Sequence, residues 1–189
     1  MGVTLFVGCT LIAMSPAVIM SVLFVAPKAN LVLLMIFSGF FLVLSVCAAS
    51  VTWLLLPALH DWPVAALLEG VLWQEAARWA FYRMCAEADK RTQALSVGKV
   101  ISLSPNRLDA MLAAGLGAAG ASAALMVGGT LELSLLPGTY YPPSCPSMSL
   151  FLASSLLACL SLHCNLFLAV VAFHAYRRGD WPRTAGVAG

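Results

Sequence analysis

The chain has 189 residues, of which 61% are hydrophobic and only 10% are charged, and its mean hydropathy is +0.94. This composition excludes an ordinary soluble domain and is typical of a protein that crosses the membrane several times. The net charge of +2 matters less than the placement of the charges, and we expect no nucleic-acid partner.

Five apolar blocks follow one another along the chain. They cover approximately residues 3–26, 31–56, 62–84, 108–131 and 148–176. Each block is long enough for the roughly 20 residues that cross a hydrocarbon core as a helix, and the alternation typical of membrane β-strands is absent. The sequence therefore predicts an all-α protein, a five-span transmembrane helical bundle. Its single domain covers residues 1–183, followed by a short tail of residues 184–189.

The basic residues predict the orientation of this bundle. If the blocks cross the membrane alternately, the first loop, the third loop and the C-terminal tail share one side. That side carries nine of the ten basic residues: Lys28, Arg83, Lys90, Arg91, Lys99, Arg107, Arg177, Arg178 and Arg183. The other side carries His60, Asp61 and Glu132, with no Lys or Arg. By the positive-inside rule, the N-terminus is outside or lumenal and the C-terminus is cytosolic.

The third block carries a polar seam, which we define as Gln74, Glu75, Arg78 and Tyr82. On a helix these four side chains fall within an arc of about 100°. A charge at bilayer depth costs about 2.5–3.5 kcal/mol, so it usually faces protein and pairs. Glu75 and Arg78, three residues apart, can partly neutralise each other. Two interpretations stay open: the seam holds the bundle together internally, or it also docks a membrane segment of a partner.

The fourth block is rich in small residues, which allow helix backbones to approach closely and to associate in lipid. Spacing by four places Gly115, Ala119 and Ala123 in one stripe, and Gly117 with Ala121 in another. Each stripe predicts a tight internal contact or a groove for a helix of another subunit, and we expect a face this small all round to serve both.

The fifth block contains two polar residues at mid-span, His163 and Asn165. A polar side chain at this depth is a functional-site candidate, and the alternative is a hydrogen bond across helices. We interpret Cys159 and Cys164 as small core residues rather than metal ligands, and we expect no metal and no cofactor. The sequence has no HExxH, no Gly-x-Ser-x-Gly and no pair of intramembrane aspartates, so we expect no catalytic residue.

Short motifs in the first three blocks occur in the order found in a known family. They are Met1-Gly2, Phe6, Gly8-Cys9-Thr10, Ala13 and Pro16, then Phe40-Phe41, Ser45, Ala49-Ser50-Val51 and Trp53, then Gln74-Glu75, Arg78 and Ala88-Asp89. Together they resemble the anterior pharynx-defective family, a subunit of gamma-secretase. The resemblance runs over nearly the whole chain.

This resemblance implies a non-catalytic scaffold that stabilises presenilin and nicastrin, assembles with presenilin enhancer, and lies in the lipid bilayer. It implies support for intramembrane processing of type I membrane proteins such as Notch and amyloid precursor protein. It also implies a multi-pass membrane protein that is located in the endoplasmic reticulum, Golgi, plasma membrane and endosomes. Because the family has seven spans, we expect this chain to lack the last two. The family histidine of the fifth span falls on Asn165.

Two alternatives remain open. The chain could be an independent small transporter or enzyme in which Glu75, Arg78 and His163 line a polar path. It could also be a truncated relative that is defective in assembly. Recovery with presenilin and nicastrin favours the scaffold, whereas a stable solitary chain with turnover or flux favours the first alternative.

Overall fold

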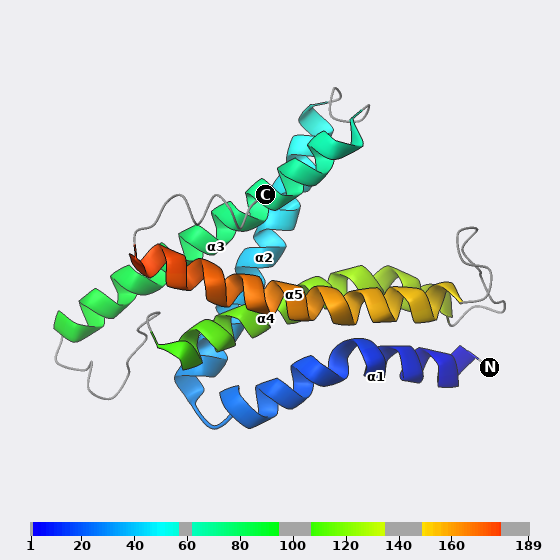
Figure 1. The fold of residues 1–189 in the computed structure, drawn as a ribbon, viewed down its shortest axis with the longest axis horizontal. Coiled ribbons are helices and arrows are strands. Elements are labelled where there is room, and N and C mark those ends of the chain that lie inside the picture. Colours follow the sequence, from blue (N-terminus) through cyan, green and yellow to red (C-terminus); the bar gives the residue numbers. More distant parts are fainter. Residues whose placement is uncertain (1, 57–61, 95–106, 135–148, 179–189) are drawn as a thin grey trace.

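The computed structural model describes residues 2–56, 62–94, 107–134 and 149–178, and they form helices without any strand (Figure 1). This confirms the all-α prediction for the described residues. Helix α1 spans Gly2–Met20 and continues as a π-helical turn, η1, over Ser21–Val25. The other helices are α2 (Ala29–Leu55), α3 (Pro63–Ala94), α4 (Leu108–Ser134) and α5 (Leu150–Arg178).

Among the described residues, four helical segments are long and apolar enough to cross a membrane. They are Phe6–Val25, Ala29–Leu55, Leu108–Thr130 and Leu150–Arg177. Helix α3 has 32 residues but is not among them, since Glu69, Glu75 and Arg78 interrupt its apolar sequence. Length and composition therefore support four spans, and the fifth depends on how the charges of α3 are accommodated.

Helix α4 lies at the centre of the bundle. It packs against α1, α2 and α5, whereas α3 contacts only α2 and α5 (Figure 1). Within the span of α4, 67% of the residues are buried, compared with 17% to 33% in the other three spans. Side chains from all of these helices contribute to one apolar core, which includes Ala13, Leu34, Phe81, Ala119 and Leu162.

The small residues of α4 explain its central position. A Cβ atom on Gly117 would lie only 2.0 Å from the carbonyl oxygen of Met35, so the stripe with Gly117 faces the backbone of α2. A Cβ on Gly115 would lie 3.1 Å from Ala169 of α5. Ala119 and Ala123, which follow Gly115 along one face, have exposed fractions of 0%. Both stripes thus form internal contacts of this chain, as the first of the two interpretations predicts.

The charged ends of the helices gather at one end of the molecule. The starts of α2 and α4 and the ends of α3 and α5 all lie toward the left of Figure 1, along the longest axis. There Nζ of Lys28 lies 2.7 Å from Oδ2 of Asp109, and Nη2 of Arg107 lies 3.8 Å from the same oxygen. For these described helix ends, the charges that the sequence places on one side thus also lie together in space.

Candidate functional site

The polar seam of α3 faces the interior of the chain. Arg78 is buried, and its side chain is 9% exposed, while that of Glu75 is 16% exposed. The two residues form the ion pair that their spacing allows. Gln74 and Tyr82 are half-buried on either side of the pair. Glu75 and Arg78 are therefore paired within α3 itself, independently of the other helices.

Asn165 connects this pair to two further helices. Arg78 donates a hydrogen bond from Nη2 to Oδ1 of Asn165 on α5, at 2.8 Å. The amide nitrogen of Asn165 donates to Oγ of Ser122 on α4, at 3.2 Å, and to Oγ of Ser161, at 3.3 Å. Because an amide both accepts and donates, Asn165 can satisfy the cation on one side and hydroxyl groups on the other.

Tyr176 completes the arrangement from the end of α5. Its hydroxyl group donates to Oε2 of Glu75, at 3.2 Å, so the carboxylate is held by two helices. We define the polar network as the side chains that these bonds join: Glu75, Arg78, Ser122, Ser161, Asn165 and Tyr176. The polar network fixes α3, α4 and α5 relative to one another.

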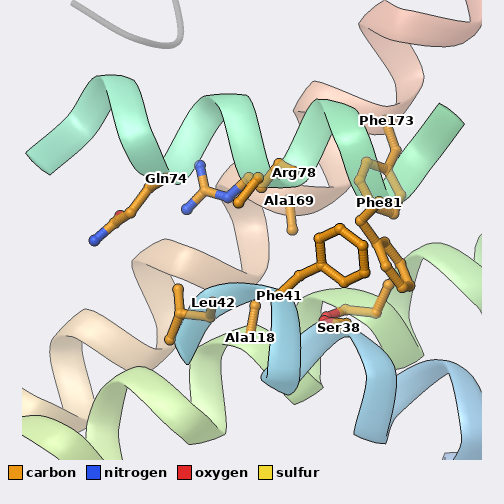
Figure 2. Close-up of a pocket in the computed structure, with 11 residues that line it drawn as sticks. Ser38, Phe41, Leu42, Gln74, Arg78, Phe81, Ala118, Ala169 and Phe173 are labelled. Atoms are coloured by element: carbon orange, nitrogen blue, oxygen red, sulfur yellow. The ribbon is translucent and has the colours of Figure 1, made fainter. Parts of the chain in front are cut away.

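A small cavity of about 20 Å³ lies beside Arg78 (Figure 2). It is lined by residues of α2, α3, α4 and α5, among them Ser38, Gln74 and Ala118. The Nε atom of Arg78 is buried and has no hydrogen-bond partner among the described residues. A cavity of this size has room for one water molecule, which such a donor would bind.

Aromatic rings cover one side of this cavity, where Figure 2 shows Phe41, Phe81 and Phe173 together. The ring centroids of Phe41 and Phe81 are 5.5 Å apart, and those of Phe81 and Phe173 are 6.2 Å apart. Tyr82 continues the cluster, with its ring 5.5 Å from that of Tyr176. These rings shield the buried charges and add packing between α2, α3 and α5.

Comparison with known proteins identifies the family. The family model described as Aph-1 protein matches residues 4–189. The chain belongs to the Aph-1 family. A relative from Danio rerio, gamma-secretase subunit Aph-1b, is 30% identical over 190 residues, which are 96% of this chain and 72% of that protein. Gamma-secretase subunit APH1-like from Arabidopsis thaliana is 26% identical over 186 residues, covering 95% and 74% of the two chains. The family resemblance of the motifs is thereby confirmed.

In this Aph-1 family member, His163 and Asn165 of α5 form different kinds of hydrogen bond. Nδ1 of His163 lies 2.8 Å from the carbonyl oxygen of Cys159, one turn earlier on the same helix. Among the described residues, the hydrogen bond of His163 stays within α5, whereas Asn165 forms hydrogen bonds across helices, which was one of the two interpretations of both residues. Residues two apart on a helix point about 200° apart, so only one of them can face α3.

The different bonds of His163 and Asn165 bear on the alternative of an independent transporter or enzyme, in which Glu75, Arg78 and His163 would line a polar path. Glu75 and Arg78 meet Asn165, and the described hydrogen bonds of His163 do not join that group. Within the described ranges, no three His, Cys, Asp or Glu side chains gather in a way that could hold a metal ion. What the polar network can do chemically is bind helices to one another.

Three members of the polar network were not predicted from the sequence: Ser122, Ser161 and Tyr176. Ser161 could have been found, because it precedes Asn165 by one helical turn. Ser122 is the one polar side chain in the run from Leu112 to Met126, which is a weaker signal. Tyr176 carries no such signal, because its bond to Glu75 joins residues 101 positions apart.

Proposed function

We propose that this Aph-1 family member is a non-catalytic scaffold subunit of a gamma-secretase complex. Its curated relatives carry the name gamma-secretase subunit. The observation that supports a scaffold is the polar network, in which Glu75 and Arg78 are engaged in bonds between helices. A subunit whose buried charges hold its own helices rigid offers fixed surfaces to other subunits.

The partners in this proposal are presenilin, nicastrin and presenilin enhancer. The complex would process type I membrane proteins, such as Notch and amyloid precursor protein, within the membranes of the endoplasmic reticulum, Golgi, plasma membrane and endosomes. Large apolar side chains on the outer faces, such as Leu11 at 60% exposed and Leu54 at 78%, suit contact with lipid or with partner helices.

The proposal includes one transmembrane domain with five spans, α3 being the third. Internal pairing of Glu75 and Arg78 lowers the cost of placing α3 in lipid. The basic ends of the helices, gathered at one end of the molecule, favour a cytosolic position for that end and for the C-terminus.

Labelling of single cysteines in sealed membranes tests this topology. In a variant without the other native cysteines, Cys145 should react with an impermeant reagent from the outside. A Gln93→Cys variant, otherwise free of cysteine, should react only from the cytosolic side. Reaction of both positions from the same side would contradict the five-span arrangement.

Co-purification in mild detergent tests the scaffold role. The tagged full chain should recover presenilin and nicastrin in stoichiometric amounts. A solitary, stable chain that shows turnover or flux would contradict the scaffold and favour an independent transporter or enzyme.

We also propose that the polar seam docks a membrane segment of presenilin in addition to its internal role. Exchanging the two charges, Glu75→Arg with Arg78→Glu, should leave insertion intact and abolish co-purification, because a buried charge that loses its partner costs roughly 3–5 kcal/mol. Asn165→Leu serves as the matched control, since it breaks the internal bond to Arg78 without altering the charges of α3. Recovery of presenilin at the wild-type level by the variant with exchanged charges would assign the seam to internal packing alone.

A further inference from the structure

A second polar site lies between α2 and α3, apart from the polar network. A pocket of about 320 Å³ is lined by Ser45, Ser50 and Trp53 of α2 and by Glu69, Gly70 and Gln74 of α3, together with small apolar side chains. Its volume falls within the range of sites that bind small organic ligands.

Among the described residues that line this pocket, Glu69 is the only charged one. Its carboxylate oxygen Oε1 is buried and has no hydrogen-bond partner among the described residues. An unsatisfied buried carboxylate oxygen is costly, because it has lost its bonds to water and gained none in return. Glu75 has Arg78 as its counter-charge, whereas Oε1 of Glu69 has no partner among the described residues.

The hydroxyl groups of the pocket are also acceptors. Ser45 donates its hydroxyl hydrogen to the carbonyl oxygen of Leu42, at 2.7 Å, and Ser50 donates to that of Val46, at 2.9 Å. A hydroxyl group has one hydrogen and two lone pairs, so each of these serines retains only lone pairs for a ligand. The carboxylate of Glu69 adds further acceptor positions, and Trp53 adds an aromatic ring.

Three polar side chains of the lining, Ser45, Ser50 and Glu69, offer acceptors, and with the indole ring of Trp53 they suit a cation that carries several N–H donors. A primary ammonium group has three donors and no acceptor, and a ring face attracts its charge. We propose that this pocket binds the primary ammonium group of an amphiphilic amine, with Glu69 as the counter-charge. The apolar part of the ligand would lie along the exposed side chains of α2 and α3.

Two sources can supply this ammonium group: the ethanolamine headgroup of a membrane lipid, or a free alkylamine. Glu69 lies six residues after the start of α3 at Pro63, about 9 Å along the helix axis. The site is therefore close to the end of the helix, where lipid headgroups lie if α3 spans the bilayer. The proposal does not rest on assembly with other subunits, because every lining residue belongs to this chain.

Native mass spectrometry of the full chain tests the lipid source. The protein is equilibrated with equal amounts of phosphatidylethanolamine and phosphatidylcholine that share the same acyl chains, so the two lipids differ only in methylation of the amine. We expect phosphatidylethanolamine to be retained about tenfold more strongly, the effect of one hydrogen bond to a charged group. Glu69→Gln should remove this preference. Glu87→Gln, at an exposed glutamate of the same helix that pairs with Arg91, should keep it.

Addition of n-octylamine to the protein in phosphatidylcholine alone tests the free source. A rise in Tm that Glu69→Gln abolishes, without preferential retention of phosphatidylethanolamine, would identify a free amine as the ligand. Preferential retention without that rise would identify the lipid. Either result supports the ammonium site.

A second variant keeps the proposal testable if Glu69→Gln alters the fold. A Cβ on Gly70 meets nothing within 4 Å, so Gly70→Leu should fill the pocket and leave the carboxylate in place. We expect it to abolish binding while the Tm without ligand is unchanged. Equal retention of both lipids with no response to octylamine would overturn the proposal, as would stabilisation by sodium ions but not by amines.

Discussion

Helices α4 and α3 are joined to α5 by different kinds of contact. Helix α4 is central, and its Gly115 and Gly117 bring it into contact with α5 and with the backbone of α2. Helix α3 is peripheral: it packs mainly against α2 and is joined to α5 through Arg78, Asn165 and Tyr176. In lipid there is no hydrophobic force between helices, so association depends on close packing or on polar bonds. This chain uses both: close packing holds α4 against α2 and α5, and polar bonds add to the contact between α3 and α5.

Steric disruption of α4 should have the largest effect. In Gly117→Leu the side chain would occupy the place of the Met35 carbonyl group, and a backbone in the middle of a helix cannot move aside. We expect a loss of stability of at least about 3 kcal/mol, the upper part of the range for overpacking. Thermal unfolding in detergent would measure it. Gly120→Leu is the control, because a Cβ at Gly120 meets nothing within 4 Å. Equal Tm values for the two variants would contradict the close contact with α2.

Removing the cation of α3 should have the next largest effect. Arg78→Met leaves Glu75 buried without its counter-charge, which costs roughly 3–5 kcal/mol where such pairs have been broken. The double variant Glu75→Gln with Arg78→Met should recover part of this loss, because no buried charge remains. Arg91→Met is the control: its pair with Glu87 has side chains 79% and 55% exposed, and such pairs are worth at most about 1 kcal/mol. A double variant no more stable than Arg78→Met would show that the charge is not the cause.

The link between α3 and α5 can be tested without changing any charge. Asn165→Leu removes the bonds to Arg78 and Ser122, and hydrogen bonds between membrane helices are worth about 0.6 kcal/mol on average and up to about 1.7. His163→Leu removes only a bond within α5 and should change the Tm less. A larger effect at His163 than at Asn165 would mean that α5 presents its other face to α3.

The exposed ion pair between Lys28 and Asp109 should have the smallest effect. Its side chains are 53% and 43% exposed, so Lys28→Gln should cost less than about 1 kcal/mol. The difference in Tm between wild type and variant should shrink as salt is added, because exposed charges are screened. A difference independent of salt would indicate that the pair is shielded from solvent.

For α3 and α4, the sequence predicts which face matters but not which helix that face meets. The stripes of α4 and the seam of α3 follow from helical periodicity, which is a local property. Periodicity cannot show that Gly117 meets α2 while Gly115 meets α5. It also could not choose between His163 and Asn165, because the rotation of α5 is set by the packing of residues such as Leu162 and Leu166 in the common core.

The sequence predicts the pairing of Glu75 with Arg78 but not the distant partners of these two residues. Glu75 and Arg78 are three residues apart, so their ion pair could be predicted from spacing. The bonds to Asn165 and Tyr176 join residues 87 and 101 positions apart, and no local pattern specifies them. The pocket at Glu69 depends on the spacing between α2 and α3, which the sequence does not reveal.

The order of synthesis gives the Glu75–Arg78 pair a further consequence. Asn165 follows Arg78 by 87 residues, so at about 5–20 residues per second a ribosome needs roughly 4–17 s to supply it. During that interval α5 is not yet available to bind α3. A counter-charge one turn away on the same helix is already present when Arg78 leaves the ribosome. Glu75 can therefore neutralise Arg78 during synthesis, and α5 adds its bonds to the same pair later.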